Sequence, residues 1–237
     1  MQPNPRWPAF LLLFACLLTP LAAAGPYLSS NELPDASKLL PPPPAPGSPE
    51  DIADRESAYH VYAAHTPEQF ANASDQQQLT PFHLTAKVVP WFQPGKFPKT
   101  EALLKQVQTE SYAVSQQAKR LWNRPRPYVA EPNRFNPVID KETKPTPSYP
   151  SGHAIRATLF ASILAELFPE HREAIYEKAA ESGWLRVMGG VHTPLDIFAG
   201  RTLGQATAQA FLKSEAFQKD LLEAKAELAA HAQKAGG

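Results

Sequence analysis

Apolar residues recur at helical spacing along four stretches of the chain, at about residues 100–122, 154–168, 169–182 and 194–230. Residues three and four apart share one face of a helix, so each stretch predicts a helix that buries an apolar face. Gly183 is expected to end the third helix. Runs in which β-branched and polar residues alternate, which would predict strands, are nearly absent. The sequence therefore predicts an all-α fold, formed as a single compact helical-bundle domain.

The composition is that of a globular chain with balanced charge. Of 237 residues, 43% are hydrophobic, which is enough to bury one sizeable core. Lysine plus arginine and aspartate plus glutamate number 23 each, so the formal net charge is zero. Balanced charge creates no basic field for a polyanion, and we expect no nucleic-acid polymer as a partner.

Residues 1–24 have the pattern of an export signal. Arg6 precedes the apolar run 9–19, and small residues follow it, so we place cleavage after Ala24. The run is too short to be a permanent membrane anchor. Cys16 is the only cysteine in the sequence and lies inside this run. A lipid-anchored form would use it, but the apolar run continues past this residue, and the mature chain then has no disulfide.

Prolines mark the next boundary. Several of the 26 prolines cluster in residues 25–48, which we assign as a proline-rich N-terminal segment. Within and just after it, we interpret residues 39–51 as stiff and polyproline-like. Ser48 has the features of a helix N-cap, because Pro49 suits the first position of a helix. We therefore assign residues 49–237 to the all-α domain.

Three short polar segments interrupt the helical pattern, and the first is KRLWNRPRPYV. Within it, Lys119 ends a predicted helix, and Arg126 follows seven residues later, just before Pro127. Two cationic side chains at this position can simply lie in solvent at the end of a helix, where the helix dipole stabilises positive charge. They can equally form part of an anion-binding site.

The second polar segment is PSGH, residues 150–153, which opens a strongly apolar helix. The first turn of a helix has unpaired N–H groups and a partial positive charge, which suit an anion. Gly152 would let a ligand approach the backbone closely. Taken alone, the segment fits a plain helix start equally well, with Ser151 as the N-cap and Gly152 as a turn residue.

The third polar segment, LRVMGGVHTPLD, contains Arg186, His192 and Asp196. A spacing of four can bring a carboxylate onto an imidazole across one helical turn, leaving the other ring nitrogen as a nucleophile. The structural alternative is that Thr193 caps a helix and Asp196 completes a capping box. Neither His192 nor His153 lies in a tight Cys/His cluster, so the sequence predicts no metal site.

Together the three segments resemble the three-part signature of the type 2 phosphatidic acid phosphatase superfamily. The matching elements are Lys119-x6-Arg126-Pro127, Pro150-Ser151-Gly152-His153 and Arg186-x5-His192-x3-Asp196. The closer resemblance is to the bacterial class A non-specific acid phosphatases, which are secreted and carry a similar proline-rich segment, here LLPPPPAPGS. The resemblance implies an all-α phosphatase with its active site at helix N-termini and loops.

The resemblance also implies how a phosphate group is bound. Lys119, Arg126 and Arg186 would contact the phosphate oxygens, since ammonium and guanidinium groups suit a dianion. Ser151 and the backbone N–H of Gly152 would complete the phosphate site.

The implied reaction is hydrolysis of a phosphomonoester through a phosphohistidine at His192, which Asp196 orients. His153 would protonate the leaving alkoxide and then deprotonate water, with no metal or cofactor. The implied partners are small phosphomonoesters, and the implied location is periplasmic or secreted, with no membrane contact after signal cleavage. The physiological substrate and a homo-oligomeric state stay open.

Two positions depart from the signature. Leu185 stands where a serine usually precedes the arginine of the third segment, and Ala154 stands where a threonine commonly follows His153. Both changes remove a hydroxyl near the site, so substrate affinity or local order can differ from the family pattern.

Other functions share parts of the pattern. A vanadate-dependent haloperoxidase would bind vanadate through the residue matching His192, but such chains are usually much longer. A non-catalytic phosphate-binding protein would need the three cations but not the His192–Asp196 pair opposite His153. An integral-membrane lipid phosphatase would need several spans of about 20 apolar residues, which this sequence lacks.

Overall fold

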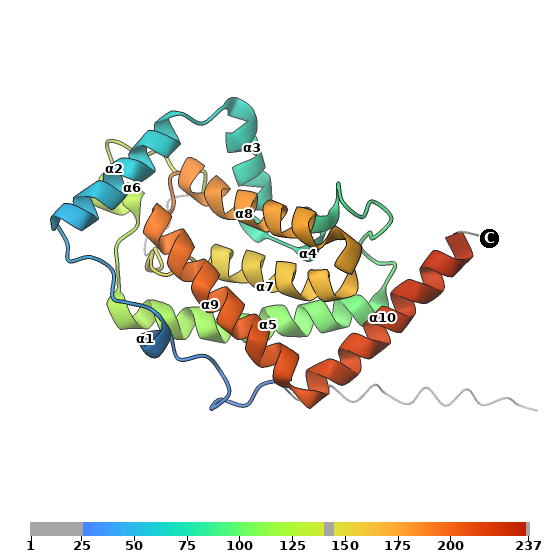
Figure 1. The fold of residues 1–237 in the computed structure, drawn as a ribbon. Helices are drawn as coiled ribbons and strands as arrows, with labels where there is room; N and C mark the ends of the chain where they lie inside the picture. Colours follow the sequence, from blue (N-terminus) through green and yellow to red (C-terminus); the bar gives the residue numbers. More distant parts are fainter. Residues whose placement is uncertain (1–25, 140–144, 236–237) are drawn as a thin grey trace, which may run out of the picture.

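The computed structural model describes residues 26–139 and 145–235; the predicted export signal at residues 1–24, with Cys16, lies outside the described residues. All regular secondary structure within the described ranges is helical, which confirms the all-α prediction (Figure 1). The longer helices are α2 (Pro49–Ala63), α5 (Pro98–Trp122), α7 (Gly152–Leu167), α8 (Arg172–Met188), α9 (Pro194–Lys213) and α10 (Glu215–Ala235). The shorter ones are α1 (Ala36–Leu39), α3 (Pro67–Asp75), α4 (Pro81–Thr85) and α6 (Pro127–Ala130), with 3-10 turns η1 (Gln76–Gln78) and η2 (Pro169–His171).

Helix α7 is the centre of the bundle. In Figure 1 it lies between α5 and α8, with α9 crossing beside it, and it also contacts α4 and α10. Leu159 and Ile163 share one side of the helix, Phe160 and Leu164 the next, and Ala157 and Ala161 a third, and all six are fully buried. A helix that is apolar all round is stable only when other helices cover every side of it.

Two glycines let α9 lie directly against α7. A Cβ atom at Gly200 would be 2.6 Å from the carbonyl oxygen of Ser151, and one at Gly204 would be 2.6 Å from that of Ile155. Only glycine allows such a close approach of backbone to backbone. Because the two glycines are four residues apart, they form one smooth face, and the contact sets the first turn of α9 beside the first turn of α7.

The structure corrects two helix boundaries expected from the sequence. Helix α8 continues through Gly183 to Met188, and a Cβ atom at Gly183 would be 3.1 Å from the side chain of Ile197. This glycine therefore makes room for α9 instead of ending α8. The periodic stretch 194–230 is two helices, because Ser214 has extended backbone and its hydroxyl donates to the carbonyl of Tyr27 at 2.7 Å.

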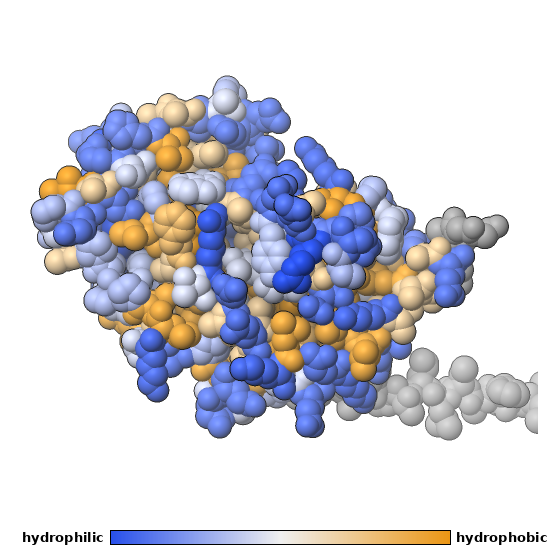
Figure 2. All heavy atoms as spheres, viewed as in Figure 1, coloured by the Kyte–Doolittle hydropathy of each residue, from blue (hydrophilic) through white to orange (hydrophobic). Residues whose placement is uncertain are grey.

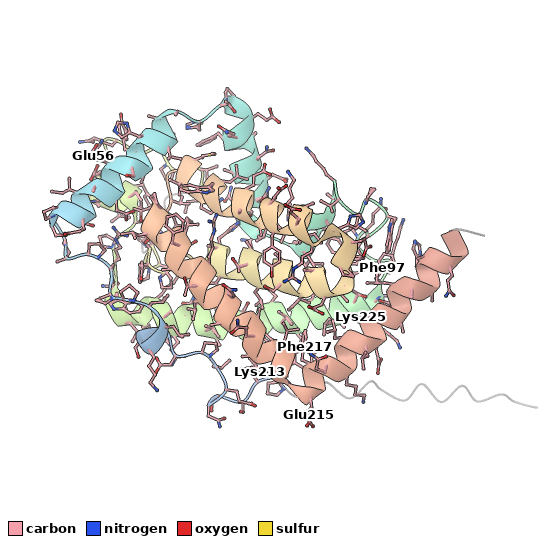
Figure 3. The ribbon with its side chains drawn as sticks, viewed as in Figure 1. Glu56, Phe97, Lys213, Glu215, Phe217 and Lys225 are labelled. Atoms are coloured by element: carbon pink, nitrogen blue, oxygen red, sulfur yellow. The ribbon has the colours of Figure 1, made fainter. Side chains whose placement is uncertain are left out.

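The described part of the proline-rich segment, residues 26–48, lies against the bundle. Tyr27 is 6% exposed, and its ring centroid is 5.5 Å from that of Phe217. Figure 3 labels Phe217 near the start of α10 and Phe97 close to the later part of this helix. There the ring of Phe97 packs edge-on against His231, with centroids 5.0 Å apart. Aromatic contacts thus fix both ends of α10.

The surface matches that of a globular protein. On the face shown in Figure 2, apolar side chains lie in separate clusters among polar ones. Among the helices of the described ranges, none combines the length and hydropathy that a membrane span requires.

Four helix ends meet at one end of the bundle: the C-termini of α5 and α8 and the N-termini of α7 and α9 (Figure 1). Direct bonds join them. The backbone N–H of Ser151 donates to the carbonyl of Asp196 at 2.9 Å, and that of Val191 donates to Arg186 at 3.1 Å. The three polar segments of the sequence are therefore brought together where these helices begin and end.

Candidate active site

The second polar segment forms the N-terminus of α7. The Ser151 hydroxyl accepts a hydrogen bond from the backbone N–H of Ala154 at 3.2 Å, which confirms its role as the N-cap. A hydroxyl that accepts this bond retains its own hydrogen for a second partner. A Cβ atom at Gly152 would lie 2.6 Å from the Ser115 hydroxyl and 3.7 Å from Cε of Lys119. Glycine at this position is thus needed to pack α7 against α5, beside the Lys119 side chain.

The third polar segment forms the N-terminus of α9, where one carboxylate has two tasks. Asp196 accepts the backbone N–H of Thr193 at 2.9 Å, and the Thr193 hydroxyl accepts from Asp196 N, so the capping box is present. The same Oδ2 of Asp196 lies 3.2 Å from Nδ1 of His192. One carboxylate therefore both completes the capping box and contacts His192, and Nε2 of His192 points away from it.

Arg126 reaches the imidazole from the opposite side. Its Nη1 lies 3.4 Å from Nε2 of His192 and donates to the carbonyl of Val191 at 3.2 Å. Its Nε and Nη2 donate to the carbonyl and hydroxyl of Thr146, both at 2.9 Å. The guanidinium is therefore held between the loop before α7 and the loop before α9.

The other two cations are almost completely buried. Lys119 is 5% exposed, and its ammonium group donates to the carbonyls of Pro147 and Ser148. Arg186 is also 5% exposed, and its Nη1 donates to the carbonyl of Ala73 at 2.7 Å. Within the described residues, neither cation forms an ion pair with a carboxylate, which is unusual for buried charges.

The pKa values show that these cations oppose one another. Burial, followed by the charge of Arg126, lowers the pKa of Lys119 to about 7. The same two causes lower the pKa of Arg186 to about 10. A buried anion would offset both effects, because it supplies the opposite charge that no ion pair gives to Lys119 or Arg186 within the described residues. The arrangement is suited to a phosphate-sized dianion.

Both imidazoles are neutral near pH 7. Burial is the main cause that lowers the pKa of His192 to about 3; the hydrogen bond that His192 donates to Asp196 works against the shift, and the charge of Arg126 adds to it. Burial, followed by the charge of Arg186, lowers the pKa of His153 well below its ordinary value. Burial alone would raise the pKa of Asp196, but its bond with His192 and the other charges near it hold that pKa below the usual range. The pair is thus a neutral imidazole beside an ionised carboxylate.

His153 stands in the first turn of α7. Its Nε2 lies 3.0 Å from the hydroxyl of Ser182 on α8, and it lies close enough to Arg186 and His192 for their charges to lower its pKa. The structure therefore brings together all eight residues that the signature selected: Lys119, Arg126, Ser151, Gly152, His153, Arg186, His192 and Asp196.

Four further residues that the signature did not select hold Asp196 in place. Arg124 is 7% exposed, and its Nη1 donates to Asp196 at 3.1 Å. Its Nη2 donates to Asp51 at 3.0 Å and to Asp54 at 2.8 Å, both on α2. The hydroxyl of Ser148 donates to Asp196 as well, and lies 3.3 Å from Nδ1 of His192. Every oxygen of the Asp196 carboxylate thus has a donor, which keeps it ionised and in one orientation.

The sequence contains only a partial sign of this network. Arg124 is two residues before Arg126 in NRPRP, but nothing local tells which arginine faces the phosphate site and which faces Asp196. Ser148 is similarly close to the second polar segment. Asp51 and Asp54 are about 70 residues from Arg124 in sequence, so no spacing rule could link them.

A cavity of about 330 Å³ lies on the far side of Arg124. It is lined mainly by the proline-rich segment and the end of α5, with residues Pro43, Pro44, Ala45, Pro46, Gly47, Asp51, Arg55, Trp122, Asn123, Arg124, Pro125, Pro127, Ala130 and Thr193. None of the eight signature residues lines it. The cavity therefore adjoins the network that holds Asp196, and it is distinct from the phosphate site.

Comparisons with known proteins agree with this geometry. Residues 107–219 match the PAP2 superfamily. The chain is 28% identical over 225 residues to the non-specific acid phosphatase of Salmonella typhimurium, covering 92% of this chain and 90% of that protein. It is 28% identical over 202 residues to the acid phosphatase of Zymomonas mobilis, covering 82% of this chain and 75% of that protein. Its fold is similar to that of a bacterial vanadium-dependent iodoperoxidase, with a TM-score of 0.53 and 21% identity over 75% of this chain and 54% of that one.

Residues 107–219 therefore form a PAP2 superfamily domain, which confirms the resemblance seen in the three polar segments. Both of these relatives align with most of the chain's length, and both are named acid phosphatases. The similarity to the peroxidase concerns the fold alone.

Proposed function

We propose that this acid phosphatase of the PAP2 superfamily hydrolyses small phosphomonoesters through a phosphohistidine at His192. The observation that carries the proposal is the pairing of His192 Nδ1 with Asp196 at 3.2 Å, on the side of the ring away from Arg126. This pairing leaves Nε2 as the nucleophile, directed to the place where the cations would hold a phosphate. Its neutral state near pH 7 keeps the lone pair available.

The substrate's phosphoryl group binds between the cations. Lys119, Arg126 and Arg186 contact its oxygens, and the hydroxyl of Ser151 and the N–H of Gly152 donate to it from the first turn of α7. In the empty site Arg126 is directed at Nε2 of His192. A bound phosphate replaces the imidazole as the partner of Arg126 and frees Nε2 for attack. The three cations also offset the charge that develops in the transition state, which is why no metal is needed.

The reaction has two steps. Nε2 of His192 attacks phosphorus and forms the N–P bond while the bond to the leaving oxygen breaks and His153 donates its proton to that oxygen. Asp196 stabilises the positive charge that appears on His192. In the second step His153 removes a proton from water, the hydroxide attacks phosphorus, and the N–P bond breaks to release inorganic phosphate. His192 and His153 return to their starting states.

The location that we propose is periplasmic or secreted, because residues 1–24 have the pattern of an export signal. The mature chain would act without membrane contact on small phosphomonoesters.

The nucleophile is tested by substitution. His192→Ala is expected to lower the rate of para-nitrophenyl phosphate hydrolysis by several orders of magnitude, because no other group can form the covalent intermediate. Asp196→Asn should lose less, since the nucleophile remains but is poorly oriented. Acid-quenched wild type should carry an acid-labile phosphohistidine, and the assay should give the same rate after exhaustive chelation. A phosphoenzyme on serine or aspartate would overturn the assignment.

The same assay separates the other functions. A haloperoxidase would oxidise bromide when vanadate and peroxide are added, whereas a phosphatase should be inhibited by vanadate, which imitates the five-coordinate phosphoryl group. A phosphate-binding protein without catalysis would bind phosphate tightly and release no para-nitrophenol.

A further inference from the structure

His153 has a partner of a different kind from that of His192. Its Nε2 lies 3.0 Å from the Ser182 hydroxyl, and Ser182 is 1% exposed, one helical turn before Arg186 on α8. Within residues 26–139 and 145–235, this is the one side-chain hydrogen bond of the His153 ring. The bond therefore holds the ring from the α8 side and leaves Nδ1 as its second nitrogen.

In the part of the chain that the structure describes, no carboxylate forms a hydrogen bond or ion pair with His153. The charged or titratable groups that influence it are Arg186 on α8, Arg156 on α7, His192 beside α9 and His83 on α4. Every one of them disfavours the protonated ring. A serine hydroxyl neither adds to this positive charge nor cancels it, so its effect on His153 is one of orientation.

A neutral partner suits a group that must give a proton and then take one back. The Ser182 hydroxyl can accept a hydrogen bond from Nε2–H when the ring is neutral and when it is charged. The exchangeable proton is then confined to Nδ1 in both states. A carboxylate in the same place would favour the charged ring and hinder proton donation to the leaving group.

We propose that Ser182 is a positioning residue for His153, which fixes Nε2–H and makes Nδ1 the nitrogen that exchanges protons with the leaving group and with water. The inference rests on the proposed function, and in particular on His153 as the general acid. It assigns a role to α8 beyond supplying Arg186.

The test compares two substrates whose leaving groups need protonation to different degrees. Para-nitrophenolate departs with little protonation, whereas an alkoxide needs a full proton, so a misplaced acid affects alkyl phosphates more. Ser182→Ala is expected to lower kcat/KM for glycerol phosphate on the order of tenfold and to leave kcat/KM for para-nitrophenyl phosphate within about twofold; the full general-acid contribution is about 10²–10⁴. The ratio kcat/KM reports the steps through departure of the leaving group, so it does not include the role of His153 in the second step, which both substrates share. Ser182→Thr restores a hydroxyl and should recover most of the loss.

Ser162→Ala is the matched control, because Ser162 is also a buried helical serine, bonded to Thr158 and Tyr176 and away from His153. It should lower the rates on both substrates equally or not at all. Histidine ¹⁵N spectra give a second measurement that needs no turnover. Neutral His153 should carry its hydrogen on Nε2 in the wild type, and Ser182→Ala should shift it toward a mixture of both tautomers.

Two results would overturn the inference. An equal loss on aryl and alkyl phosphates would mean that Ser182 only supports packing, and an unchanged tautomer with unchanged rates would mean that it does not position the ring. Each of these two results would rule out the role of Ser182. Neither would contradict the proposed function as long as the wild type hydrolyses both substrates. A wild type inactive on both substrates would remove the two together.

Discussion

At the scale of single residues, the site works by keeping neutral two groups that would ordinarily be half-charged near neutral pH. His192 and His153 are both buried, and both lie near guanidinium groups that disfavour an added proton. In the mechanism that we propose, His192 benefits directly, because a neutral ring has a lone pair to donate. The general acid is affected in the opposite way, because His153 must be protonated before it can act.

This conflict predicts an acidic optimum for kcat/KM. His192 must be unprotonated, a condition met above its pKa of about 3. His153 must be protonated, and its lowered pKa places that condition below the ordinary imidazole value of about 6.5. We therefore expect a bell-shaped profile whose alkaline limb falls on the acidic side of neutrality.

A pH–rate series with para-nitrophenyl phosphate measures this limb. The rates are corrected for ionisation of the substrate, which a separate titration of its phosphate group gives. His153→Ala should flatten the alkaline limb for this substrate and leave alkyl phosphates nearly inert. An optimum above about pH 8 would contradict the assignment of His153 as the acid, since its proton would then be absent.

At the scale of elements, α2 is part of the active-site scaffold although no signature residue lies on it. Asp54 accepts the N–H of Leu195, in the first turn of α9, at 3.0 Å. With Asp51 it also anchors Arg124, whose other nitrogen holds Asp196. The orientation of the nucleophile's carboxylate thus depends on a helix more than 100 residues earlier in the chain.

We expect Asp54→Asn to weaken this support without touching the phosphate site. An amide cannot match the charge-assisted bond to Arg124, so the free energy of unfolding should fall by about 1–3 kcal/mol. The rate kcat should fall roughly tenfold with KM little changed, because an orientation effect acts on the transition state more than on binding. Glu50→Gln is the matched control: Glu50 is exposed and lies on α2 about one turn before Asp54. An increase in KM with unchanged kcat would place Asp54 in substrate binding instead.

At the scale of the whole molecule, the site concentrates positive charge in buried surroundings. Lys119 and the two imidazoles all have lowered pKa values, so the folded chain binds protons less tightly than the unfolded chain does. For such groups stability is lost as the pH falls from the unfolded pKa toward the folded one. The interval is from 10.5 to about 7 for Lys119 and from 6.5 to about 3 for His192.

The thermal midpoint of the phosphate-free protein should therefore decrease steadily from about pH 8 to about pH 5. Inorganic phosphate should raise it at each pH, and most at low pH, because a bound anion favours the protonated forms. Calorimetry or circular dichroism measures both effects. Lys119→Met removes one buried charge and should reduce the effect of phosphate. A midpoint independent of phosphate would argue against a built anion site.

The sequence by itself determined the features that depend on neighbouring residues. The all-α fold followed from helical periodicity, which is a property of residues three and four apart. The cap at Ser151 and the capping box of Thr193 and Asp196 followed for the same reason, since each bond spans three residues. The identities of the signature residues were also legible, because each polar segment is short.

Only the tertiary structure decided which distant groups meet. Gly183 continues a helix because Ile197 packs on it, a contact that no local rule contains. Arg124 faces Asp196 while Arg126 faces His192, although the two arginines are nearly adjacent in sequence. The Ser182 hydroxyl meets His153 because α8 returns alongside α7. Such contacts join residues far apart in the chain, and they form only where the packing of whole helices brings those residues within reach.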